Sequence, residues 1–261
     1  MIFWKFGGDM SLIIILLCLL LQRYFNLNCQ SYQSSWVLPY TRFLHSKFST
    51  VNEKNDLVGT LLLVVPILFV LAIIFALISL VVGPVGYYLM LFFVLWFCLD
   101  GRDLHQHPYQ EISVEQYFQQ CFHVQFSIIF WFAILGWFGT VLYFVVMTLI
   151  RVLSQSSGEN KQLSLLVQLQ ALLDWVPVRL LGLTFALVGS FSTVIKSWVA
   201  SLTTRLDKID ALITEWGEIA IEKPQIELVK QEMSAVISLL DRALLVWLVV
   251  IALVSIGMWL G

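Results

Sequence analysis

The sequence is poor in charge: only 12% of its 261 residues are Asp, Glu, Lys or Arg, whereas 59% are hydrophobic. About a quarter of the residues in a soluble domain are charged, so this chain lacks the polar side chains needed to cover a core in water. Its net charge is −2, which offers no basic field for a nucleic-acid partner. The composition therefore predicts an integral membrane protein that is solvated by lipid.

Cysteine is also scarce, and none of the four residues belongs to a C-x-x-C pair. Two lie in apolar runs, so we expect small buried side chains rather than disulfides or a zinc site. The four are Cys18, Cys29, Cys98 and Cys121. Serine nucleophile motifs, glycine-rich phosphate loops and H-E-x-x-H are lacking as well. The sequence thus offers no catalytic set, and it predicts neither an enzyme nor a cofactor.

A signal-peptide cleavage site is missing too. Lys5 precedes an apolar stretch over residues 10–21, but Gln22, Arg23 and Tyr24 follow it without a small-x-small pattern. We therefore expect this stretch to be retained as a membrane anchor.

Long apolar runs are what the sequence has instead. A transmembrane helix needs about 20 apolar residues, and residues 57–98 carry no charged side chain. Gly83-Pro84-Val85-Gly86 interrupts that run, which predicts a helical hairpin. The predicted spans are residues 10–21, 57–82, 87–98, 126–150 and 243–260, with a weaker one at 175–188. We predict an all-α bundle of roughly four to six spans, forming one membrane domain over residues 1–261.

Polar segments separate these spans. Apolar side chains at helical spacing in residues 22–56 predict an amphipathic helix at the headgroup level. The same periodicity in residues 190–242 predicts two amphipathic helices outside the membrane, separated at Pro224 and followed by a C-terminal anchor at 243–260. These helices could serve packing alone, or they could present a face to a protein partner. Residues 100–121 and 151–162 are predicted polar loops.

Lys and Arg gather in segments 22–56 and 190–242, which predicts that both face the cytoplasm. Two segments on one side of a membrane require an even number of crossings between them. This requirement favours counting residues 175–188 as a span.

The most unusual local sequence is Asp174-Trp175-Val176-Pro177-Val178-Arg179. Asp174 is a good N-cap and Pro177 suits a first turn, so a helix is predicted to begin after Asp174. A charge within a span costs about 2.5 to 3.5 kcal/mol and therefore needs a partner or a cavity. One interpretation is an Asp174–Arg179 ion pair that holds the bundle. The other is a phosphate or headgroup site built from Arg179 and free backbone N–H groups.

The four histidines give weaker signals. His105 and His107 flank Gln106, close to Asp103, but a solvated loop explains them better than a metal site does. His45 and His123 are isolated in the sequence.

Three segments resemble the AmpE family of inner-membrane proteins: LLDWVPVRL at residues 172–180, FALVG at 185–189 and KSWVASL at 196–202. The resemblance implies a multi-pass protein of the inner membrane of a Gram-negative bacterium. It also implies a regulatory, non-enzymatic role in β-lactamase induction, linked to cell-wall recycling. The ligand site that we expect on this basis comprises Asp174, Trp175, Pro177 and Arg179.

AmpE is in turn similar to the CobD/CbiB membrane enzymes, which use ATP to attach aminopropanol to adenosylcobyric acid. Residues 130–139 are similar to their central span, and Arg102-Asp103-Leu104-His105 resembles the polar start of a cytoplasmic helix, which adds Arg102, Asp103 and His105 to the expected site. Ile150 and Gln170-Ala171 stand where the enzymes carry acidic residues, and such residues would hold magnesium and phosphate. The resemblance thus implies an inherited scaffold without the enzyme's chemistry. A surviving magnesium- and ATP-dependent transferase, and an assembly partner for a single-span protein such as a pilin, remain the alternatives.

Overall fold

The computed structural model describes residues 8–24, 56–99, 113–154, 161–202, 209–221 and 229–260, and its regular structure in these residues is entirely helical. The elements are α2 (Gly8–Tyr24), α5 (Asp56–Val82), α6 (Pro84–Cys98), α8 (Val114–Cys121), the π-helix η1 (Phe122–Phe126), α9 (Ser127–Leu135), α10 (Trp137–Ser154), α11 (Lys161–Val188), α12 (Phe191–Ala200), α13 (Ile209–Ala220) and α14 (Val229–Leu260). The predicted all-α fold is confirmed. The expected amphipathic helix at 22–56 lies outside the described residues, apart from its two ends.

Five helical segments in the described residues are long and apolar enough to cross a bilayer, a number within the predicted range. They are Val64–Val82, Val114–Leu135, Trp137–Ser154, Gln162–Val188 and Met233–Gly257. Two shorter apolar helices, Leu12–Leu21 and Pro84–Cys98, accompany them. The chain is therefore a multi-pass membrane protein. The side of the membrane on which residues 22–56 and 190–242 lie stays a prediction.

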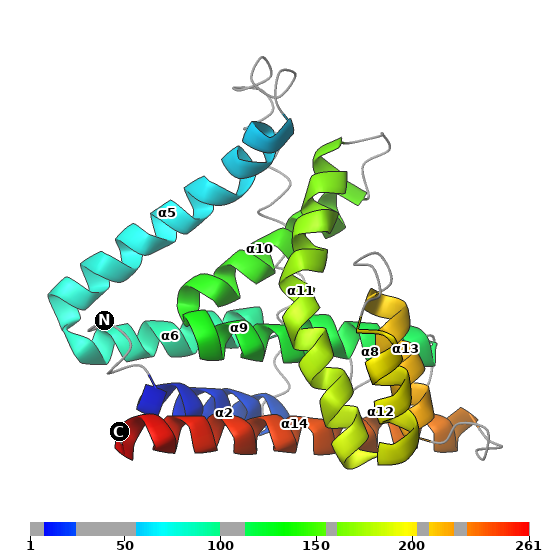
Figure 1. Ribbon diagram of the computed structural model, residues 1–261. Coiled ribbons are helices and arrows are strands. Elements are labelled where there is room, and N and C mark those ends of the chain that lie inside the picture. The colour runs from blue at the N-terminus through cyan, green and yellow to red at the C-terminus, as the bar shows by residue number, and fades with distance from the viewer. Residues whose placement is uncertain are drawn as a thin grey trace.

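The predicted hairpin is present as α5 and α6, which meet at the left-hand end of the molecule in Figure 1. Gly83 adopts φ 73° between them, a conformation that costs other residues energy, and Pro84 occupies the first helical turn of α6. The second arm starts a few residues before the expected position 87, because Pro84 begins a helix as readily as it ends one.

The single span predicted at residues 126–150 is wrong. Gly136, at φ 62°, ends α9 and lets α10 start in a new direction, so two helices replace one. The loop predicted at 100–121 is also wrong for its last part. A capping box between Ser113 and Gln116 starts α8 there, and α8 continues through η1 into α9. The loop predicted at 151–162 is shorter than expected, because α10 reaches Ser154 and α11 begins at Lys161.

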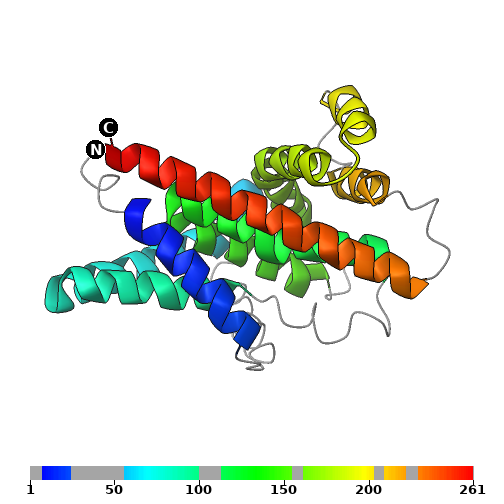
Figure 2. The same cartoon turned by 90° about the horizontal axis from the view of Figure 1, so that it is seen from below.

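Two further helix boundaries differ from the prediction. No helix begins after Asp174, because α11 already starts at Lys161 and carries Asp174 and Pro177 in its interior. The second amphipathic helix and the C-terminal anchor are one continuous helix, α14, which runs alongside α2 (Figures 1 and 2). Neither Gly nor Pro occurs between Val229 and Ile256, so nothing in the backbone stops the helix where the side chains change from amphipathic to apolar.

Candidate functional site

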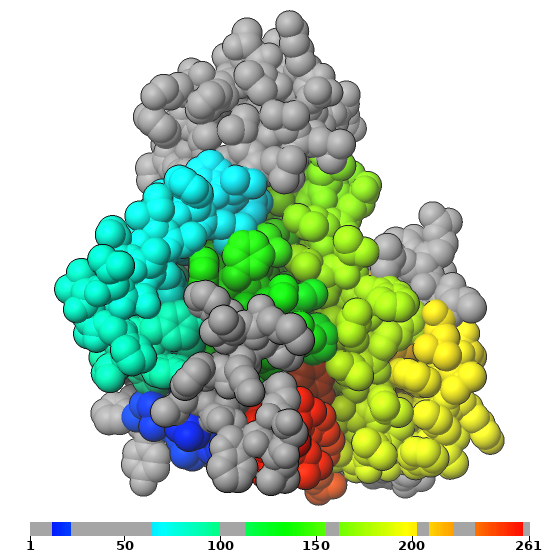
Figure 3. Space-filling view, turned by 60° about the vertical axis from the view of Figure 1, so that its left-hand side comes forward, coloured from blue at the N-terminus to red at the C-terminus, as the bar shows by residue number. Residues whose placement is uncertain are grey.

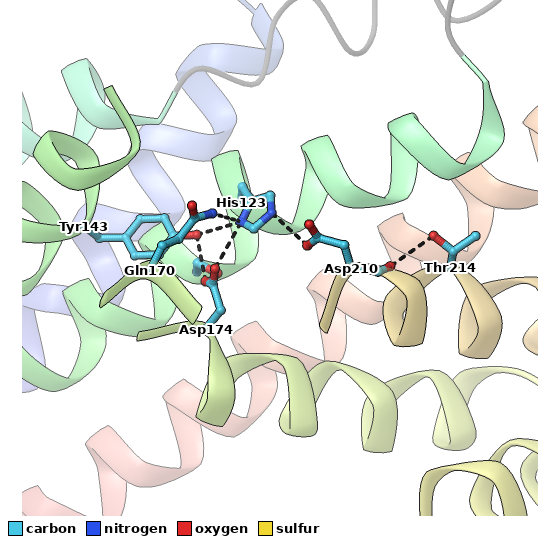
Figure 4. Close-up of polar contacts among 7 residues, drawn as sticks. His123, Tyr143, Gln170, Asp174, Asp210 and Thr214 are labelled. Carbon is cyan, nitrogen blue, oxygen red and sulfur yellow. Dashed lines mark hydrogen bonds and ion pairs between the residues drawn. The ribbon is translucent and has the colours of Figure 1, made fainter. Parts of the chain in front are cut away.

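A polar cluster lies where η1, α10, α11 and α13 meet, and His123 is at its centre (Figure 4). His123 belongs to η1, a single π-helical stretch between two fully buried phenylalanines, Phe122 and Phe126. Insertions of this kind within α-helices are rare and occur frequently at functional sites, because they re-aim a side chain. The His123 side chain is only 12% exposed.

Asp174 forms the buried end of the cluster and is 2% exposed. Its Oδ1 accepts hydrogen bonds from the Tyr143 hydroxyl at 2.8 Å and from the Ser127 hydroxyl at 3.2 Å. Its Oδ2 lies 3.4 Å from Nδ1 of His123. Three groups therefore converge on one carboxylate inside the candidate span Gln162–Val188, which is how a buried acid avoids the full cost of desolvation.

The two ring nitrogens of His123 contact opposite ends of the polar cluster. Tyr143 gives its one proton to Asp174, and its oxygen also lies 2.9 Å from Nδ1 of His123. His123 Nε2 lies 3.2 Å from Oδ1 of Asp210, and an ionised carboxylate only accepts. Nε2 therefore acts as a donor, and the imidazole bridges two carboxylates. Gln170 completes the surroundings, with its amide nitrogen 3.4 Å from Nδ1.

Asp210 forms the exposed end of the cluster, in the first turn of α13, with its side chain 56% exposed. The hydrogen bond from His123 holds the pKa of Asp210 below its ordinary value, and it outweighs partial burial, which acts in the opposite direction. The candidate spans do not include α13. The cluster therefore leads from a helix outside the spans to a carboxylate within them.

Arg179 does not pair with Asp174, so the predicted ion pair between them is wrong. One turn and a half of α11 turns the two side chains toward different neighbours. The Arg179 guanidinium donates to the Ser201 carbonyl at 2.6 Å and lies 6.0 Å above the ring of Trp216. The indole N–H of Trp198 in turn donates a hydrogen bond of 2.9 Å to the Arg179 carbonyl. Arg179 thus satisfies the C-terminal end of α12 and fixes α12 and α13 against α11.

The other expected site residues are not brought together. Trp175 is 45% exposed and Pro177 is buried in the interior of α11. Arg102, Asp103 and His105 lie outside the described residues, as does Cys29. Cys18, Cys98 and Cys121 are free and buried, as predicted. Within the described ranges, no three His, Cys, Asp or Glu side chains are grouped as ligands for a metal ion.

The sequence prediction included Asp174 but missed its partners Ser127, His123 and Tyr143, and it also missed Asp210, the second partner of His123. A usable signal was present. His123 and Ser127 are polar residues within an apolar segment, and an ionisable side chain inside a span is a site candidate by default. Asp210 could not be found in this way, because it is an ordinary acidic residue on the polar side of an amphipathic helix.

The family model described as "Regulatory signalling modulator protein AmpE" matches residues 116–260, which is more than half of the chain and includes the whole polar cluster. Comparison with curated proteins found no match, and comparison with solved structures found none either. The expected similarity to the CobD/CbiB enzymes is not shown by any of these comparisons. They likewise give no support to the transferase or to the assembly partner of a single-span protein.

Proposed function

The chain belongs to the AmpE family of regulatory signalling modulators, and from this we propose that it couples a buried polar switch in its bundle to the helices α12 and α13 outside the spans. The observation that carries the proposal is the contact of 3.2 Å between His123 and Asp210. This contact links the cluster around Asp174 to α13. A change in the protonation or packing of the cluster would therefore change how α13 sits on the bundle.

The coupling needs α13 to respond as a unit, and its packing supports this. Trp216 is fully buried against the bundle, and Arg179 lies over its ring. Ser190 donates to the Ile219 carbonyl at 3.0 Å, and Ser197 donates to the Glu215 carboxylate. Bonds from α12 and the turn before it thus hold the second half of α13, whereas Asp210 lies in its first turn. Because a helix of this length moves as a rigid element, movement at Asp210 would be transmitted to α12.

The role that we propose is not enzymatic. Ser127 is fully buried and gives its proton to Asp174, so its oxygen is neither accessible nor next to a free base. The Tyr143 hydroxyl is committed in the same way. Such a cluster suits a switch whose states differ in hydrogen bonding better than it suits a site that turns over a substrate.

We further propose that the regulated output is β-lactamase induction, linked to cell-wall recycling, and that the protein resides in the inner membrane. A strain lacking the gene, and carrying an inducible β-lactamase, would be complemented with the wild type, with His123→Gln or with Asp210→Asn. Each strain would be exposed to an inducing antibiotic, and β-lactamase activity would be measured over time. We expect the deletion to alter induction, the wild type to restore it and both variants to fail.

Glu115→Gln is the matched control, because it removes an exposed acid from the first turn of α8 without touching His123 or the bonds that hold α13. It should complement like the wild type. Protein levels in the membrane fraction must be equal across the strains. Unaltered induction in the deletion strain would refute the proposal that β-lactamase induction is the regulated output. Full complementation by both cluster variants would refute the switch while leaving the output in place.

The proposed direction of signalling places α12 and α13 on the cytoplasmic side. A topology reporter fused after Lys208 would test this, and we expect it to score as cytoplasmic. Periplasmic activity of the fusion would move the signalling surface to the other side of the membrane.

A further inference from the structure

A groove of about 710 Å³ lies between α5, α6 and α10, and no residue of the polar cluster lines it. The two arms of the hairpin meet at Gly83 and then diverge, and α10 lies in the opening between them (Figure 1). In the space-filling view the green surface of α10 is visible beside the cyan α5 (Figure 3). Every residue that lines the groove is apolar.

The floor and the mouth of the groove differ in accessibility. On α10, Val141 and Val145 are 4% and 2% exposed and form the floor. On α5 and α6, Val70 and Phe93 are 54% and 60% exposed and stand at the mouth. The groove is therefore open to whatever surrounds the protein at the depth of the spans Val64–Val82 and Trp137–Ser154. At that depth the surroundings are hydrocarbon, because water is absent from the bilayer core.

Volume decides between the two kinds of occupant that a bilayer offers. A transmembrane helix about 10 Å across and about 30 Å long fills about 2,400 Å³, so the groove could contain only a small part of one. A hydrocarbon chain about 5 Å wide that spans one leaflet, about 15 Å, fills about 300 Å³. Two such chains account for the space. We propose that the groove binds the two acyl chains of one membrane lipid.

The lipid would complete the packing of α5. Only 17% of the span in α5 is buried within the protein, compared with 50% or more in the three spans that follow it. Along the groove Val70 of α5 is 54% exposed, whereas Phe75, nearer the hairpin turn, is buried against Trp137 of α10. Transfer from bulk lipid into the groove gains no hydrophobic free energy, so shape and dispersion must provide the selectivity.

Substitutions that fill the groove test the proposal on the full-length protein. Val70→Phe and Val94→Phe place a ring in the space that the acyl chains would use, one from each arm of the hairpin. Val65→Phe is the matched control, because Val65 lies on the same helix as Val70, is 51% exposed and does not line the groove. Each protein would be purified in detergent, delipidated, titrated with dipalmitoyl phosphatidylglycerol and examined by native mass spectrometry. Thermal unfolding in detergent alone would confirm that each variant is folded.

We expect the wild type and Val65→Phe to retain one lipid each, and we expect both groove variants to retain at least fivefold less at equal lipid concentration. Their unfolding midpoints in detergent alone should equal or exceed that of the wild type, because the ring replaces the lipid. Equal lipid retention by all four proteins would overturn the proposal. The proposal would also be overturned if a protein, rather than lipid, co-purified stoichiometrically with the wild type and if the groove variants abolished that co-purification. Failure of this experiment leaves the proposed regulatory function untouched, because none of the cluster residues lines the groove.

Discussion

His123 and Asp210 are 87 positions apart in the sequence, yet Nε2 of one lies 3.2 Å from Oδ1 of the other. The contact is the point at which a helix outside the spans meets the polar interior of the bundle. His123 contributes its ring from a π-helical stretch, and Asp210 contributes its carboxylate from the first turn of α13. An acidic side chain at that end of a helix is also favoured by the helix dipole. Two independent effects therefore stabilise the same carboxylate.

The first prediction is a loss of this contact in acid. The folded-state pKa of Asp210 is lowered by its bond from His123, so the pair is fully stabilising above the ordinary pKa of about 3.9 and is lost as the pH falls through the lower folded value. The unfolding midpoints of the wild type and of Asp210→Asn would be measured in detergent between pH 3 and pH 7. We expect the wild type to be slightly more stable at pH 6, by less than about 1 kcal/mol because the Asp210 side chain is 56% exposed.

That difference should shrink toward the acidic end of the range, since protonated Asp210 resembles the asparagine of the variant. The comparison between the two proteins cancels the general loss of stability in acid, which both share. A difference that stays constant down to pH 3 would show that the hydrogen bond to His123 does not depend on the charge of Asp210.

The second prediction concerns the buried end of the cluster. Asp174→Ala removes the acceptor on which Tyr143, Ser127 and His123 converge, and it leaves buried donors without a partner. We expect a loss of about 3 to 5 kcal/mol in the free energy of unfolding. Asp174→Asn keeps one oxygen acceptor and should cost clearly less. The measurement is reversible unfolding in mixed micelles. A cost for Asp174→Ala below that for Asp174→Asn would contradict this account of the cluster.

The third prediction tests whether Arg179 is structural or binds an anion. In the structure its guanidinium donates to the Ser201 carbonyl at the end of α12, so Arg179→Gln should loosen α12 and α13 in the absence of any added ligand. Removing a charged hydrogen bond of this kind costs about 1.5 to 3 kcal/mol. Hydrogen exchange of the amides of α12 and α13 would report the change, with Arg151→Gln as the control on an exposed arginine in the last turn of α10. Faster exchange only when phosphate is removed from the wild type would instead favour an anion site.

Much of the fold could be predicted from the sequence, because apolar length and helix-breaking residues act locally. Gly83 and Pro84 placed the turn of the hairpin correctly. Gly136 was overlooked, because a lone glycine is tolerated inside many helices and only the structure shows its positive φ. At Asp174 and Pro177 the sequence predicted a helix start that does not exist. Both residue types are common at helix starts, but here they lie inside α11, which begins at Lys161.

The polar cluster was harder to predict, because it depends on contacts between distant residues. One interpretation of the sequence paired Asp174 with Arg179, five positions away, yet the partners of Asp174 come from η1, α9 and α10. Choosing among the polar residues of a bundle requires the order in which its helices pack, and helical periodicity does not contain that order. The π-helical stretch that aims His123 has no clear sequence signature either.

The last prediction tests whether the packing of α13 on α8 controls the contact between Asp210 and His123. Gly217 of α13 packs so closely on α8 that an added methyl group would lie 2.5 Å from the ring of Phe118. Phe118 is fully buried, so the ring cannot swing away and α13 must shift. Gly217→Ala should therefore cost about 1 to 3 kcal/mol by overpacking, and it should break the bond between His123 and Asp210, although neither residue is changed.

Gly257→Ala is the matched control, because nothing lies within 4 Å of the added methyl group on α14. It should leave stability unchanged or raise it slightly, since alanine favours a helix over glycine. The decisive measurement is a double-mutant comparison. In the Gly217→Ala background, the further change Asp210→Asn should have no effect on the unfolding midpoint at pH 6, whereas in the Gly257→Ala background it should have its full effect. Equal effects of Asp210→Asn in both backgrounds would mean that α13 keeps its contact with His123 when the packing of Gly217 on Phe118 is disturbed. In that case the bond to His123, rather than packing, would fix the position of the helix.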